Sequence, residues 1–173
     1  MRAKTKHAFI IAFFAALPVL ADPGGGDSIR GGAPQDPVLE KVLAANAQQD
    51  WPRAEAILRD ALAKEPGNAD YHNLYAYAIR KGTSPNVDLV FKHYNEALRI
   101  DPRHRGAHEY IGEAYLMVGN LAKAKEHLAA LDRLCFFGCE EYSMLKQAVA
   151  EYETKKATFS VPATKADLAR PSG

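Results

Sequence analysis

The sequence is short of cysteine and has no excess of either charge. Only two of its 173 residues are cysteine, too few for a fold that depends on several disulfides. Its 22 basic and 21 acidic residues leave no surplus of positive charge to neutralise a phosphate backbone. The composition therefore argues against a disulfide scaffold and against nucleic acid as a partner.

The sequence also lacks an apolar run long enough to cross a membrane. The run from Ala8 to Leu20 has 13 residues and includes Pro18, whereas a membrane-spanning helix needs about 20 apolar residues. Three basic residues precede the run, and it closes on small residues at Ala21, as in a cleavable secretory signal peptide. We expect residues 1–21 to be removed on export to the periplasm, with no membrane insertion afterwards.

Cleavage would leave a weakly acidic chain. Without the three basic residues of the signal, 19 basic and 21 acidic residues remain, a net charge of −2. Residues 22–36 carry five glycines and two prolines and are predicted to be a flexible linker. Residues 157–173 show no sustained period and contain two more prolines, so we predict a disordered tail.

Matched residues recur at a nearly fixed distance in the remaining chain. Ala61 and Ala97 are 36 residues apart, and the next step, from Ala97 to Leu131, is 34. Apolar residues within each unit are spaced by three and four, which indicates amphipathic helices. The predicted fold class is all-α, a short solenoid over 37–156 with repeats at about 37–68, 69–104 and 105–138 and a capping helix at 140–156.

Polar residues before the apolar stretches and glycines after them predict where the helices begin and end. The expected N-caps are Asp50, Asn68, Ser84 and Asn120, and the expected stops are Gly82, Gly119 and Gly138.

Residues 108–131, HEYIGEAYLMVGNLAKAKEHLAAL, resemble a tetratricopeptide repeat (TPR). Gly112 stands at the position of close helix approach, Tyr115 lies in the first helix, and Ala124 is the small contact in the second. The segment LCFFGCEEY that follows is similar to the C-terminal cysteine motif of a group of small exported bacterial TPR proteins. The resemblance implies a solenoid whose first helices line a concave groove for a peptide or partner protein, and it implies no catalytic activity.

The groove implied by this resemblance has a mixed character. Its predicted residues are Asn73, Tyr77, Arg80 and Lys81 on the first helix of the second repeat, and Glu109 and Glu113 on that of the third. This mixture differs from the lysine and asparagine clamp of chaperone-type TPRs, which grips a terminal carboxylate, so such a ligand is not predicted. The alternative is that Arg80 pairs with Glu113 or Glu109 and only fixes the repeat geometry.

Cys135 and Cys139 flank a glycine break, and an oxidising compartment favours their pairing. We predict a structural disulfide that holds the terminal helix. The alternative function is a metal-handling or redox-linked periplasmic protein that uses both thiols. However, the C-x3-C spacing differs from the C-x-x-C of thiol oxidoreductases, and a metal would need a further ligand such as His127.

His104 and His108 are four residues apart, which is also a spacing for metal ligands. However, His72 occupies the place equivalent to His108 in the preceding repeat. Packing between neighbouring helices therefore explains the recurring histidine better than metal binding does. No phosphate-binding loop or nucleophile elbow is found in the sequence. We therefore predict no catalytic residue, metal or cofactor, and an exported protein-binding adaptor or scaffold rather than an enzyme.

Overall fold

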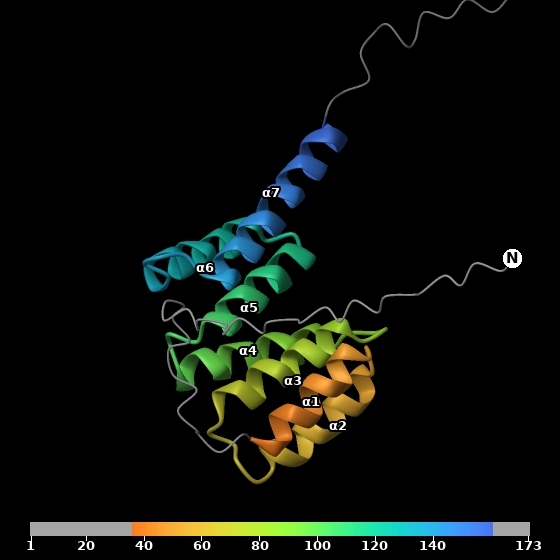
Figure 1. Ribbon diagram of the computed structural model, residues 1–173. Coiled ribbons are helices and arrows are strands. Elements are labelled where there is room, and N and C mark those ends of the chain that lie inside the picture. Colours follow the sequence, from red (N-terminus) through yellow and green to blue (C-terminus); the bar gives the residue numbers. More distant parts are fainter. Residues whose placement is uncertain (1–35, 161–173) are drawn as a thin grey trace, which may run out of the picture. The chain divides into compact units, whose positions relative to one another are not determined.

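The computed structural model describes residues 36–160, and over this range the chain forms seven α-helices and no strand (Figure 1). The predicted all-α class is confirmed. The predicted signal peptide 1–21, the linker before residue 36 and the tail beyond residue 160 lie outside the described residues. The helices are α1 (Pro37–Ala47), α2 (Trp51–Leu62), α3 (Ala69–Lys81), α4 (Val87–Ile100), α5 (Arg105–Met117), α6 (Leu121–Leu134) and α7 (Glu140–Ser160).

Three of the four predicted N-caps are confirmed. Asp50, Asn68 and Asn120 each accept a hydrogen bond from the backbone N–H three residues later. The prediction of Ser84 is wrong, because the cap of α4 is Asn86, whose Oδ1 accepts from the Leu89 N–H at 3.0 Å. Asparagine is at least as favourable as serine at this position, so the helix starts two residues later than predicted.

Asp36 belongs to the fold, although the sequence placed it in the linker. Its Oδ1 accepts from the Val38 N–H at 2.8 Å, and its Oδ2 accepts from the Tyr71 hydroxyl at 2.7 Å. The first bond caps α1, and the second ties the start of α1 to α3. An aspartate directly before Pro37 is a strong helix-start signal, since proline is favoured at the first helical position.

The helices pack in sequence order, each against the next, and the first helices α3 and α5 also contact one another. One cluster of buried residues runs from α1 to α5, and a second joins α5, α6 and α7. The recurring positions found in the sequence are buried in the second helices: Ala61 is 7% exposed, and Ala97 and Leu131 are each 0% exposed. The repeat spacing therefore identified the packing residues of the second helices correctly.

Helix α7 covers the end of the array. Leu145 and Val149 are buried in the second cluster, with Tyr142 and Tyr152 packed around them. A Cβ built on Gly112 of α5 would lie 2.6 Å from a methyl carbon of Leu145, so the predicted close approach at this glycine is confirmed.

Helix α7 also runs to Ser160, beyond the end predicted at residue 156. No proline or glycine interrupts the sequence between Gly138 and Pro162, so nothing in the chain terminates the helix earlier. The side chains of residues 153–158 are exposed, so these last turns bury no side chain against the array.

Candidate functional site

An aromatic row formed by Trp51, Tyr77 and Tyr110 crosses the helices α2, α3 and α5. The ring centroids of Trp51 and Tyr77 are 5.8 Å apart, and those of Tyr77 and Tyr110 are 4.7 Å apart. The Arg80 guanidinium carbon lies 5.5 Å from the Tyr77 centroid, and Lys81 Nζ lies 6.0 Å from that of Trp51. Cations at these distances interact favourably with the faces of aromatic rings. Sequence reasoning placed Tyr77, Arg80 and Lys81 here but missed Trp51 and Tyr110.

Arg80 is a bridge between helices. Its Nη2 donates to Glu113 Oε2 at 2.7 Å, and its Nε donates to the Tyr94 hydroxyl at 3.2 Å. The Arg80 side chain is 10% exposed and that of Glu113 is 27% exposed. The ion pair that the sequence left open as an alternative therefore forms, between Arg80 and Glu113. Together with the bond to Tyr94, it links α3, α4 and α5.

Asn73 and Glu109 differ from this pair because both are buried without a partner. They are 4% and 7% exposed. Asn73 Oδ1 has no hydrogen-bond partner among residues 36–160, and the Glu109 carboxylate makes no hydrogen bond or ion pair within that range. Burial, followed by the charges of Glu113 and Glu141, raises the pKa of Glu109 to about 7. Buried polar groups are normally satisfied, so both residues call for an explanation.

These two residues line a hollow of about 340 Å³ between α3, α5 and α7, which we call the acidic pocket. Tyr110 belongs both to its wall and to the aromatic row, so the two features are continuous. Sequence reasoning missed Glu140 and Glu141, at the start of α7, as site residues. The lining residues are Asn73, Leu74, Gly106, Glu109, Tyr110, Glu140, Glu141 and Met144.

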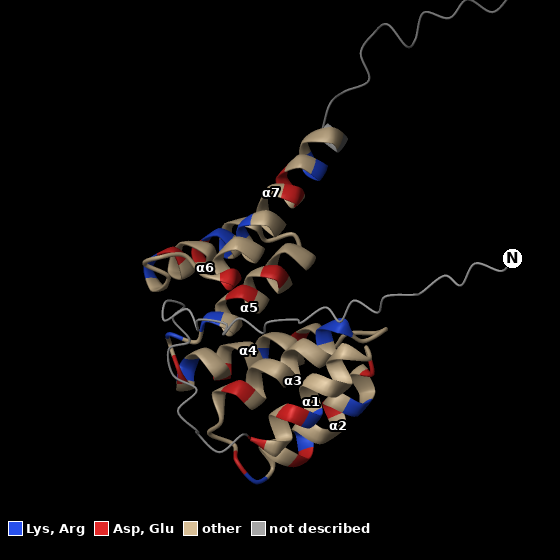
Figure 2. Cartoon of the chain, in the orientation of Figure 1, with Lys and Arg blue, Asp and Glu red and all other residues tan. Residues whose placement is uncertain are grey.

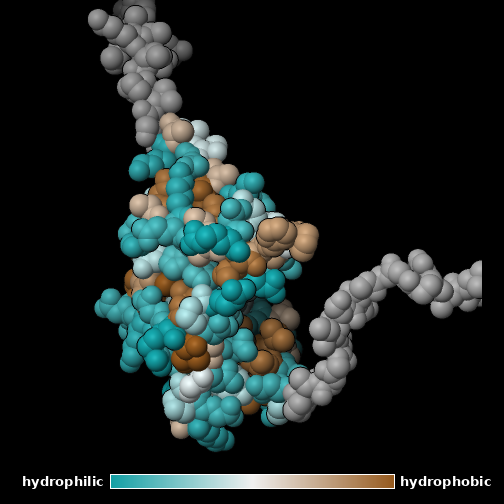
Figure 3. All heavy atoms as spheres, turned by 90° about the vertical axis from the view of Figure 1, so that its left-hand side faces the viewer, coloured by the Kyte–Doolittle hydropathy of each residue, from teal (hydrophilic) through white to brown (hydrophobic). Residues whose placement is uncertain are grey.

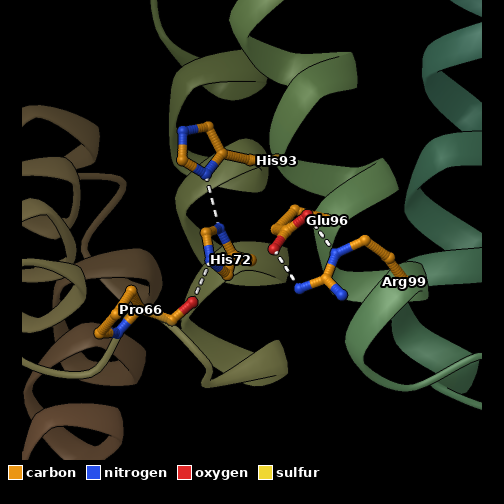
Figure 4. A network of polar contacts seen from close by, with 5 residues as sticks. All are labelled: Pro66, His72, His93, Glu96 and Arg99. Carbon is orange, nitrogen blue, oxygen red and sulfur yellow. Dashed lines mark hydrogen bonds and ion pairs between the residues drawn. The ribbon is translucent and has the colours of Figure 1, made fainter.

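A histidine pair joins α3 to α4 beside the carbonyl of Pro66 (Figure 4). His72 Nε2 lies 2.9 Å from the Pro66 oxygen, and His72 Nδ1 lies 2.7 Å from His93 Nδ1. A carbonyl oxygen only accepts hydrogen bonds, so Nε2 of His72 carries the proton. In the neutral pair, His72 Nδ1 therefore accepts from the Nδ1–H of His93.

The same arrangement recurs in the next repeat. His108 Nε2 lies 3.1 Å from the Pro102 oxygen, and His108 Nδ1 lies 3.0 Å from His127 Nδ1. The prediction that these recurring histidines serve packing is confirmed. His104 points elsewhere: its Nδ1 caps α5 by accepting from the Ala107 N–H, and its Nε2 lies 3.1 Å from an oxygen of Asp70.

No group of three or more histidine, cysteine or acidic side chains is arranged to hold a metal within the described part of the chain. Cys135 and Cys139 are joined by the predicted disulfide, with Cα atoms 5.5 Å apart. Their sulfurs are therefore not free thiols in this structure. The loop between them exposes Phe136 and Phe137 at 88% and 97%.

The charges of the described helices are mixed, with basic and acidic positions interspersed along the ribbon (Figure 2). On the face drawn in Figure 3, hydrophobic side chains form separate patches among hydrophilic ones. No described helix is both long enough and apolar enough to cross a bilayer.

The comparisons with known proteins address the fold. No protein-family model matches the chain, and no curated protein does either. Among solved structures it is similar to the TPR2B domain of yeast Sti1, determined in a complex with pHsp70, with a TM-score of 0.59 and 21% identity. The match covers 68% of this chain and 94% of that one. The chain has the TPR fold. Its three helix pairs are TPR units, and α7 is the cap that the sequence predicted.

Proposed function

We propose that the chain is an exported protein-binding adaptor or scaffold. An extended segment of a partner protein lies along the groove side of its TPR units, over the aromatic row and the acidic pocket. The TPR domain of Sti1 was solved as a protein complex, which supports a protein ligand in general. The observation that carries the proposal is the aromatic row, because a continuous line of partly exposed rings across three helices offers aromatic area to a ligand.

The row is suited to recognition because its parts are held in place before a ligand arrives. Arg80 is fixed by Glu113 and the Tyr94 hydroxyl, and its guanidinium holds the neighbouring rings from one side. Aromatic side chains bury a large area on binding and lose little rotamer freedom. Tyr77, at the centre of the row, is therefore the expected anchor.

A photo-crosslinking experiment tests the groove. A photoreactive amino acid replaces the exposed Lys81, and a matched chain carries it at Lys92, an exposed position on α4. We expect a crosslinked partner from the Lys81 position that disappears when Tyr77→Ala is added, and none from Lys92. Equal products from both positions, or products that survive Tyr77→Ala, would contradict binding in the groove.

Export is tested separately. We expect the protein in the periplasmic fraction with a mature amino terminus at Asp22, read by mass spectrometry of the intact chain. An intact Met1 in protein recovered from the cytoplasm would contradict this part of the proposal without affecting the groove.

A further inference from the structure

The acidic pocket is lined by one buried oxygen that nothing in the described chain satisfies and by a carboxylate without a partner in the same range. The Asn73 amide oxygen is an acceptor without a donor, and the Glu109 carboxylate has neither a hydrogen bond nor an ion pair within residues 36–160. A buried acceptor left unpaired destabilises a fold by about 1–3 kcal/mol, and a charged one by more. An unsatisfied buried oxygen and an unpaired carboxylate that line one hollow mark a place where a donor from another molecule can bind.

The charged groups around the pocket are unbalanced. Four carboxylates face it or lie beside it, those of Glu109, Glu113, Glu140 and Glu141. The nearby cations are already engaged or directed outward. Arg80 is bound to Glu113, and the 53% exposed Arg105 lies 3.6 Å from Glu141. Within residues 36–160 neither Glu109 nor Glu140 forms an ion pair, so the pocket repels an anion and favours a cation.

We propose that the acidic pocket takes the basic side chain of an arginine or lysine in the bound partner segment. This inference rests on the groove function proposed above and names the chemistry of the partner. The cationic head donates to Glu109 and to the amide oxygen of Asn73, and Glu140 and Glu141 face it from the start of α7. Its occupant is thus opposite in charge to the terminal carboxylate bound by clamp-type TPRs.

The shape of the pocket agrees with such a side chain. Leu74, Tyr110 and Met144 supply apolar wall, against which the methylene stem of arginine or lysine packs. The acceptors lie deeper, on buried Asn73 and Glu109. A guanidinium offers five donors in a planar fork and also stacks on aromatic rings, and Tyr110 places such a ring in the wall. Arginine is therefore expected to bind more tightly than lysine.

The test starts from the full exported chain and a display library of random twelve-residue peptides with acetylated amino termini. We expect the enriched peptides to share an arginine or lysine. Fluorescence anisotropy with a labelled enriched peptide then measures affinity for the wild-type chain and for Glu109→Gln. We expect at least a tenfold loss in the variant, and a similar loss when the basic residue of the peptide is replaced by glutamine.

The two losses are expected not to add. Once Glu109→Gln has removed the carboxylate, replacing the basic residue of the peptide should have little further effect, which is the signature of a direct interaction. Glu96→Gln is the matched control, because it removes the same charge from a carboxylate that is paired with Arg99 outside the pocket. Its affinity should equal that of the wild type. Since Glu109→Gln removes an unpaired buried carboxylate, the melting temperature of the variant should not fall. Weaker peptide binding by this variant would then not be caused by unfolding.

Several results would overturn the inference. Enriched peptides without a basic residue, or fully additive losses, would show that no cation occupies the pocket. Binding that requires a free amino terminus would place a terminal amine there, and self-association lost in Glu109→Gln would place a second copy of the chain there. Failure of the groove itself gives a different result: no peptide is enriched, or enriched peptides bind equally well to Tyr77→Ala.

Discussion

Two neighbouring residues on α3 have opposite situations, and the same contrast recurs on α5. His72 and His108 each bond a proline carbonyl and a second histidine. The next residues, Asn73 and Glu109, are buried without such partners. The histidine position is the same in both repeats, whereas the next position carries an amide in one repeat and a carboxylate in the other. A polar residue that recurs and is satisfied holds the repeats together, while one that varies and is unsatisfied points to a ligand.

The largest expected difference in stability is between the alanine substitutions of His72 and Asn73 on α3. His72→Ala should lower the free energy of unfolding by about 2–3 kcal/mol, because it leaves the His93 N–H without its partner and opens a cavity. Asn73→Ala should lower it by less than about 1 kcal/mol, because the amide oxygen has no bond to lose. Both changes place alanine in the same helix, so helix propensity contributes almost equally. Urea denaturation measures both free energies of unfolding. Equal losses would contradict the distinction between the satisfied His72 and the unsatisfied Asn73.

The histidine pairs and Glu109 should also change stability with pH in opposite directions. Burial, and then the neighbouring imidazole, lowers the pKa of His93 and of His127 to about 4. Lys92 and Glu96 also act on His93, in opposite directions. Between about pH 6.5 and pH 4 the unfolded chain then binds more protons than the folded one. The contribution of His93 and His127 to stability should therefore be complete above about pH 6.5 and be lost as the pH falls toward 4.

Glu109 gives the opposite trend, because its pKa is raised from 4.5 to about 7. The folded chain binds the extra proton in this range, so stability is lost as the pH rises from about 4.5 through 7. Glu109→Gln should raise the free energy of unfolding by about 1 kcal/mol at pH 8 and change little at pH 4. Urea denaturation across this range checks the prediction. A gain independent of pH would mean that the Glu109 carboxylate does not ionise in the folded chain.

The smallest effect is expected on the surface beside the first histidine pair. Arg99 bonds both carboxylate oxygens of Glu96 at 2.8 Å (Figure 4), but its side chain is 69% exposed. Exposed pairs three residues apart on a helix contribute little to stability, because water and salt screen the two charges. Arg99→Ala should therefore leave the melting temperature nearly unchanged. A loss of stability comparable with that of His72→Ala would show that this exposed pair supports the contact between His72 and His93.

The sequence located the candidate site only in part. The face of α3 and α5 that carries Asn73, Tyr77 and Glu109 follows from helical periodicity and from the TPR resemblance. Trp51 and Glu140 were missed because they come from other helices, and their contacts depend on how these helices pack. Neither does periodicity distinguish Asn73 from Tyr77, although one lies in the acidic pocket and the other in the aromatic row.

Local chemistry along the chain determined the helices, most of their caps, the repeat step and the cysteine pair, because each depends on residues close together in the sequence. Tertiary packing decided which buried polar groups obtain partners. His72 meets His93 of α4, while Asn73 and Glu109, 36 residues apart, face one hollow that α7 helps to enclose. Hydrogen bonds act only over a few ångströms, so only the folded arrangement of α3, α5 and α7 shows where a donor is missing.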